Sequence, residues 1–247
     1  MSLLNKYNNY YQTIVKNQNC KEFYTIYFSR FISRFLTPIL AILNMSPNFI
    51  TLTMIPIGLL SFIFLTLSDN YNFFIIGCFL LIFTNIIDTI DGELARVLNK
   101  TSITGDYLDK VSHYCVNFLG IFAIGIFIFN VTLNNSYLYL AFISTFLFTI
   151  DNILRDLLIT CGIHELKDNS RKKISEKSSF RKGAQLLIKK LLLPLFSNNG
   201  LFHISFLLGI FYKFSTISFI EIYYLFFTFV TLIKLFCRSL IIKKILK

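Results

Sequence analysis

Six apolar runs, separated by polar stretches, constrain this chain more than any other feature of its sequence. They cover roughly residues 48–67, 71–95, 108–130, 135–160, 200–215 and 217–241. A helix needs about 20 apolar residues to cross the hydrocarbon core of a bilayer. With 55% hydrophobic and 15% charged residues, the chain is more apolar and less charged than soluble domains are. The sequence therefore predicts an all-α, polytopic, integral membrane protein with six transmembrane helices.

Basic residues are distributed unevenly along the chain, whose net charge is +11. The loops after the first and third runs contain no Lys or Arg. Basic residues instead precede the first run, flank the second loop, fill residues 167–190 and end the chain. Because Lys and Arg collect on the cytoplasmic side of membrane proteins, both termini and the second loop are predicted to be cytoplasmic. This placement indicates membrane topology and gives no reason to expect nucleic acid as a partner.

An amphipathic segment, Lys21 to Asn44, lies before the first run. Arg30 and Arg34 are one helical turn apart there among Phe, Ile and Leu, a pattern typical of a helix that lies in the membrane interface. Residues 1–47 are thus expected to form a cytoplasmic N-terminal region with this interfacial helix. Residues 48–247 would form the six-helix membrane domain, with a basic cytoplasmic loop at 163–199.

Acidic residues cluster on both sides of the second loop. Asp88 and Asp91 are three residues apart, and Asp109 and His113 are four apart, so each pair shares one face of its helix. The short connection makes the two helices antiparallel neighbours, which brings the faces together at the membrane boundary. Carboxylates held so close repel one another unless a cation lies between them. A hard divalent ion such as Mg²⁺, which prefers oxygen ligands, would fit.

Small residues and an arginine accompany this cluster. Gly92 and Ala95 remove side-chain bulk beside the acidic face, and Arg96 offers a guanidinium suited to phosphate. Asp106, one turn before Asp109, could add a further carboxylate. Together these residues indicate a pyrophosphate or phosphate ester as substrate.

The same residues resemble the signature of the CDP-alcohol phosphatidyltransferases, Asp-x2-Asp-Gly-x2-Ala-Arg-x8-Gly-x3-Asp-x3-Asp. Seven of its eight fixed positions are matched with the same spacing, by Asp88, Asp91, Gly92, Ala95, Arg96, Gly105 and Asp109. The segment Pro47-Asn48-Phe-Ile-Thr51 at the start of the first run also resembles the Pro-Asn-x-x-Thr segment of that family.

This resemblance implies an enzyme of phospholipid biosynthesis that transfers a substituted phosphate from a CDP-linked donor to an acceptor hydroxyl and releases CMP. Either CDP-diacylglycerol would be the donor and a small polar alcohol the acceptor, or a CDP-linked head group would be the donor and a lipid the acceptor. Asp88, Asp91 and Asp109 would hold a divalent cation, Mg²⁺ or Mn²⁺. The CDP moiety would contact Gly92, Ala95, Arg96 and Gly105. A homodimer is the expected assembly.

His113 occupies the fourth acidic position of the signature. A neutral imidazole, whose ordinary pKa is about 6.5, can accept a proton from an attacking hydroxyl, so we expect His113 to be the general base. Two alternatives remain open: His113 is a ligand for an ion that accepts nitrogen, such as Mn²⁺ or Zn²⁺, or it packs between helices in a catalytically silent relative with a binding role. A cation carrier would also contain intramembrane aspartates, but the clustering of polar residues at one end favours the enzyme.

For several other polar residues the sequence gives less indication of a function. Asn48, Asp106 and Arg155 are candidates for substrate contact, although Arg155 would equally form an intrahelical pair with Asp151. Arg238 is expected to snorkel to the membrane interface. The spacing of the cysteines predicts neither a disulfide framework nor a zinc site; they are Cys20, Cys78, Cys115, Cys161 and Cys237.

Overall fold

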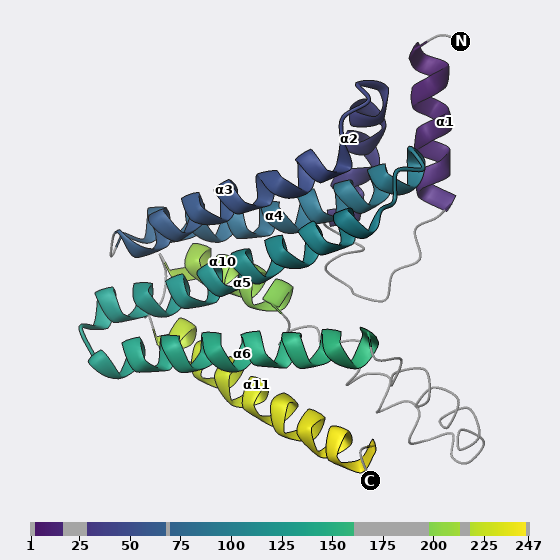
Figure 1. The fold of residues 1–247 in the computed structure, drawn as a ribbon. Coiled ribbons are helices and arrows are strands. Elements are labelled where there is room, and N and C mark those ends of the chain that lie inside the picture. The colour runs from purple at the N-terminus through teal and green to yellow at the C-terminus, as the bar shows by residue number, and fades with distance from the viewer. Residues whose placement is uncertain (1–2, 17–28, 68–69, 161–197, 213–217, 246–247) are drawn as a thin grey trace, which may run out of the picture.

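The computed structural model describes residues 3–16, 29–67, 70–160, 198–212 and 218–245. Within these ranges all regular secondary structure is α-helical (Figure 1). The helices are α1 (Leu3–Lys16), α2 (Arg30–Ile42), α3 (Pro47–Thr66), α4 (Tyr71–Val97), α5 (Ile103–Thr132), α6 (Asn135–Thr160), α10 (Asn198–Tyr212) and α11 (Ser218–Ile245). The predicted basic loop lies almost entirely outside the described residues.

Five of these helices, α3, α4, α5, α6 and α11, are long and apolar enough to cross a membrane. This confirms the predicted all-α, polytopic membrane class. The fifth predicted span corresponds to α10, which has 15 residues. At 1.5 Å per residue it is about 22 Å long, shorter than the roughly 30 Å hydrocarbon core. The described residues therefore hold five full-length spans and one short apolar helix where six spans were predicted.

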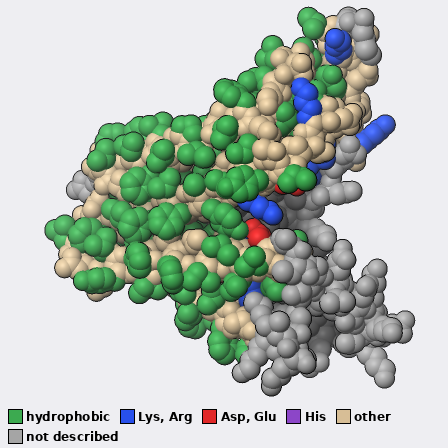
Figure 2. All heavy atoms as spheres, viewed as in Figure 1, with side chains coloured by type: hydrophobic (Ala, Val, Ile, Leu, Met, Phe, Trp, Pro, Cys, Tyr) green, Lys and Arg blue, Asp and Glu red, His purple; other side chains and the backbone are tan. Residues whose placement is uncertain are grey.

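α3 to α6 run in alternating directions, and α11 runs in the same direction as α6, so several helix ends gather at one end of the bundle (Figure 1). The turn between α4 and α5 lies at that end, next to α2, and α6 and α11 finish there. Hydrophobic side chains cover much of the visible flank, whereas Lys and Arg side chains appear toward this end (Figure 2). Such a flank suits lipid as the surrounding solvent.

The N-terminal region contains two helices where one was predicted. α2 confirms the amphipathic helix over residues 30–42, and α1 lies in a segment for which no helix was predicted. Small side chains of α2 at four-residue spacing, Ser33, Thr37 and Ala41, are buried, and α2 packs against α4. The larger residues on its other side are exposed: Phe31, Phe35, Leu36, Ile39 and Leu43.

Aromatic and small residues bring the helices together in the middle of the bundle. The rings of Phe74 and Phe127 stack with their centroids 4.2 Å apart, which joins α4 to α5. The buried Tyr224 hydroxyl donates a hydrogen bond to the Ile121 carbonyl at 2.9 Å and lies 2.6 Å from Ser144 Oγ. These contacts join α11 to α5 and α6.

α5 lies close to α6 and α11 at Gly125. A Cβ added there would lie 2.4 Å from Ala141 Cβ and 2.8 Å from the Tyr224 hydroxyl. We expect Gly125→Ala to destabilise the protein by about 1–3 kcal/mol because α5 and α6 must move apart. Thermal unfolding followed by size-exclusion chromatography in detergent measures this.

Gly92→Ala provides the matched control for stability. A Cβ at Gly92 would lie 3.5 Å or more from every neighbouring atom, so the same change in α4 should leave the melting temperature within about 1 °C of the wild type. Equal melting temperatures for the two variants would contradict the packing described at Gly125.

Candidate functional site

A tight reversal between α4 and α5 brings the two acidic faces together. Asn99 adopts a left-handed conformation with φ 53°, and the Lys100 amide donates to the Ala95 carbonyl at 2.8 Å. The Asn99 amide donates to Arg96, which completes a Schellman motif. Ser102 then caps α5 by accepting a hydrogen bond from the Gly105 amide at 3.0 Å. This turn accounts for the eight residues between Arg96 and Gly105.

Three side chains converge directly beyond this turn. His113 Nε2 lies 2.9 Å from Asp88 Oδ1 and 3.5 Å from Asp109 Oδ1. One ligand atom from each residue lies within 4.8 Å of the other two. Asp109 Oδ1 is buried, and no described residue hydrogen-bonds to it. Two carboxylates, one of which has an unsatisfied oxygen, and one imidazole make a donor set that could hold a divalent metal ion.

Asp91 lies beside this group but not in it. Its side chain is buried, and the Thr51 hydroxyl of α3 donates to Asp91 Oδ2 at 2.5 Å. The same hydroxyl lies 3.1 Å from the Pro47 carbonyl, and its single proton can serve only one of the two acceptors at a time. α3 therefore holds Asp91 in place through this hydrogen bond.

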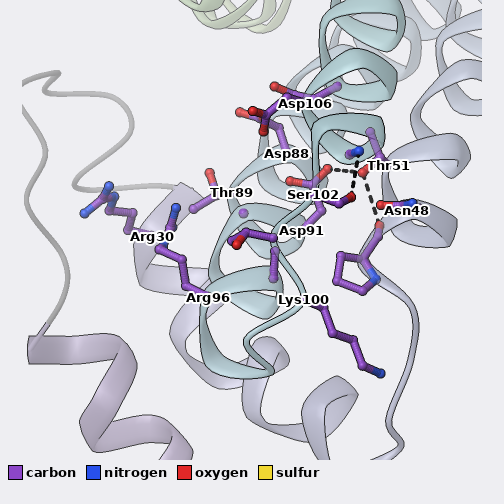
Figure 3. Close-up of a pocket in the computed structure, with 16 residues that line it drawn as sticks. Arg30, Asn48, Thr51, Asp88, Thr89, Asp91, Arg96, Lys100, Ser102 and Asp106 are labelled. Atoms are coloured by element: carbon purple, nitrogen blue, oxygen red, sulfur yellow. Dashed lines mark hydrogen bonds between the residues drawn. The ribbon is translucent and has the colours of Figure 1, made fainter.

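A pocket of about 370 Å³ opens in front of these carboxylates (Figure 3). Its volume lies in the range of small-molecule sites. Nine of the predicted site residues line it, and they come from α3, α4 and α5. These residues are Asn48, Asp88, Asp91, Gly92, Ala95, Arg96, Gly105, Asp106 and Asp109. His113, which contacts Asp88 and Asp109, is not among the described residues that line the pocket.

Two glycines of the signature make room inside this pocket. A Cβ at Gly92 would contact the Arg96 guanidinium, 3.5 Å from Nη1. A Cβ at Gly105 would lie only 3.2 Å from Asn48 Oδ1 and from Ser102 Oγ. The glycines therefore let one guanidinium and one amide lie close to the helix backbones, where a phosphate or a nucleotide can reach them.

Arg155 stands apart from the pocket. Its side chain is 55% exposed and pairs with the adjacent Asp156, with Nε 3.1 Å from Oδ1. Arg155 does not form the intrahelical pair with Asp151 that was one of its two alternatives. Asp151 instead pairs with Arg238 of α11 at 3.1 Å, and Arg238 also donates to the Asp151 carbonyl. The expectation that Arg238 snorkels to the interface is wrong for the same reason: α11 crosses α6 where Arg238 reaches a buried carboxylate.

Five pocket-lining residues were not predicted to belong to the site. Arg30 belongs to the amphipathic helix α2, Thr89 lies between the two aspartates of α4, and the turn contributes Lys100, Thr101 and Ser102. Thr89 occupies the same stretch of α4 as Asp88 and Asp91, so the signature region includes it. Arg30 reaches the pocket only because α2 packs on α4, a contact that no local pattern indicates.

The sequence is similar to that of a known protein family. The profile of the CDP-alcohol phosphatidyltransferase family matches residues 44–214, more than half of the chain. The match includes α3 to α6 and every described residue of the pocket except Arg30. No curated protein matches the sequence.

Metal binding can be measured on the purified protein in lipid nanodiscs by electron paramagnetic resonance of Mn²⁺. We expect Asp109→Asn to weaken Mn²⁺ binding by about tenfold or more, because it removes one charged oxygen from the group of Asp88, Asp109 and His113. Glu221→Gln is the control with the same change of charge, since Glu221 accepts a hydrogen bond from Tyr137 elsewhere in the bundle. Equal affinities for the two variants would contradict a metal site at this group.

Proposed function

The chain belongs to the CDP-alcohol phosphatidyltransferase family, and on that premise we propose that it is a membrane phosphotransferase of phospholipid biosynthesis. A substituted phosphate moves from a CDP-linked donor to an acceptor hydroxyl, and CMP is released. The observation that carries this proposal is the convergence of signature residues from three helices on one pocket, beside a group of side chains able to hold a metal ion.

Asp88, Asp91 and Asp109 would hold the divalent cation, Mg²⁺ or Mn²⁺. The converging oxygens of Asp88 and Asp109, one of them buried without a partner, fit such an ion, and Asp91 lies beside them in the same pocket. When bound, the ion supplies positive charge that stabilises the diphosphate as CMP leaves. Thr51, through its hydrogen bond to Asp91, keeps that carboxylate oriented toward the site.

Arg96 and the two glycines bind the donor in this proposal. The Arg96 guanidinium lies over Gly92, where its fork of N–H groups can take two phosphate oxygens. Gly105 leaves space next to the Asn48 amide, which can hydrogen-bond to the nucleotide. Ala95 lines the same wall of the pocket with only a methyl group.

His113 takes the proton in the proposed reaction. The imidazole accepts the proton of the acceptor hydroxyl, whose oxygen then bonds to the β-phosphorus while the bond from that phosphorus to CMP breaks. CMP leaves with the electron pair. Asp88, 2.9 Å from Nε2, orients the ring and stabilises the imidazolium that forms.

A ligand role for His113 is the second candidate, because Nε2 points at both carboxylates of the metal group. A base and a ligand differ in what their loss changes. Loss of a base lowers the turnover at saturating metal, whereas loss of a ligand raises the metal concentration that the reaction needs.

The position of the pocket suits substrates from two phases. The pocket lies at the end of the bundle where Arg30, Arg96 and Lys100 line it, and the positive-inside rule assigns such an end to the cytoplasm. A lipid substrate would approach from the apolar flank and a polar one from water.

A CMP-release assay on purified protein in lipid vesicles tests the function. One arm supplies CDP-diacylglycerol with small polar alcohols, and the other supplies CDP-linked head groups with diacylglycerol. We expect release with Mg²⁺ or Mn²⁺ in one arm, and a loss of about 10²-fold or more in Asp91→Asn. Glu221→Gln should release CMP at the wild-type rate. Unchanged turnover in Asp91→Asn would contradict the metal assignment, and silence in both arms with intact CDP binding would favour the silent relative.

Two substitutions at His113 distinguish its proposed roles. His113→Asp restores the carboxylate of the family signature and should retain activity, while His113→Gln should lower the turnover by about 10²–10⁴-fold at saturating metal. Titration of Mg²⁺ and Mn²⁺ against the residual activity is the measurement. An inactive but folded His113→Asp, or a His113→Gln variant rescued by higher Mn²⁺, would overturn the base in favour of the ligand.

A further inference from the structure

A second guanidinium reaches the pocket from outside the family signature. Arg30, the first residue of α2, lines the pocket together with Arg96 (Figure 3). Its Nε and Nη1 are buried, and among the residues that the structure describes neither atom has a hydrogen-bond partner. A buried charged donor without a partner is costly, so an acceptor from a bound molecule would relieve this cost.

α2 holds Arg30 in this position through contacts with α4. The buried Thr37 hydroxyl donates to Glu93 Oε2 at 3.1 Å, and Glu93 directly follows Gly92 of the signature. Ser33, one turn before Thr37, is fully buried, which lets the two helices approach closely. The helix that carries Arg30 is therefore attached to the pocket wall itself.

The other two cations of the pocket already have neighbours. Lys100 Nζ donates to Asn44 Oδ1 at 2.9 Å, and the Arg96 guanidinium lies over Gly92. Arg30 forms no ion pair with any described carboxylate, although four acidic residues line the same pocket: Asp88, Asp91, Asp106 and Asp109. Arg30 thus brings a positive charge that no described carboxylate neutralises to a pocket that would receive negative charge along with the metal ion.

We infer that Arg30 is a second phosphate-binding residue of the donor site and contacts the diphosphate of the CDP-linked substrate from the α2 side. The inference rests on the proposed function, because the residues assigned to CDP line the same pocket. A guanidinium presents a planar fork that takes two phosphate oxygens at once. Arg30 and Arg96, which Figure 3 shows at the same side of the pocket, would bind different oxygens of one diphosphate.

Arg34 is a matched control on the same helix. Its Nε donates to the Arg30 carbonyl at 3.2 Å and its guanidinium lies 5.3 Å from the centre of the Phe31 ring, and it is not among the described residues that line the pocket. Arg30→Ala and Arg34→Ala remove the same charge from α2, so a general effect of charge on membrane binding would affect both equally.

The experiment measures CDP and CMP binding by isothermal titration calorimetry, with each variant in nanodiscs and Mn²⁺ present. We expect Arg30→Ala to weaken CDP binding by about tenfold or more and CMP binding by less, since CMP lacks the β-phosphate. Arg34→Ala should stay within about twofold of the wild type, and Arg30→Lys should recover part of the loss. Melting temperatures equal to the wild type show that each variant is folded.

Equal CDP affinities of the Arg30→Ala and Arg34→Ala variants would overturn the inference, as would a wild type that binds neither CDP nor CMP. A loss of turnover in Arg30→Ala with unchanged CDP affinity would also overturn it and would assign Arg30 to a phosphate of the acceptor. Because binding is read without turnover, a wild type that binds CDP but releases no CMP contradicts the proposed function alone. A weakened Arg30→Ala would in that case still support the inference.

Discussion

The reversal between α4 and α5 determines the distance between the two acidic faces, and the rest of the site depends on it. Asn99 in the left-handed conformation ends α4, and the Ser102 cap starts α5. A turn with this hydrogen-bond pattern leaves the helices antiparallel and sets the rotation of each about its own axis. Asp88 and His113, 25 residues apart in sequence, come within 2.9 Å as a result. The carboxylates repel one another in this arrangement, so the turn holds close together charges that a bound cation would neutralise.

Most of the fold could be predicted because the membrane imposes a length on each helix. The apolar runs place α3, α4, α5, α6 and α11 within a few residues of their observed limits. α10 is too short to be a full-length span because its apolar run is short. α1 was not predicted because its residues are too polar to form an apolar run. The prediction that Asp88 and Asp109 lie on facing sides of their helices also followed from the spacing of the residues. A connection of a few residues makes the two helices antiparallel neighbours.

Contacts between helices distant in sequence could not be predicted in this way. Arg238 lies 87 residues from Asp151, and Thr37 lies 56 residues from Glu93. In each case a polar residue finds its partner only after two helices have packed, and packing in a membrane follows from close fit more than from apolar burial. Spacing alone allowed an intrahelical pair of Asp151 with Arg155. Asp151 instead pairs with Arg238 of α11, which is better buried than Arg155. The same reasoning explains why Arg30 carried no signal.

The two sides of α2 have a consequence for the protein in its bilayer. One side presents Ser33 and Thr37 to α4, whereas Phe31, Phe35 and Ile39 on the other side remain exposed, as befits a helix at the lipid surface. A wall of the pocket is thus a helix that exposes apolar side chains on its outer side. In the interfacial position expected for α2, lateral pressure, acyl-chain order and curvature would act on that helix directly, so the composition of the membrane would be a thermodynamic variable of the site, as ionic strength is for a pocket surrounded by water.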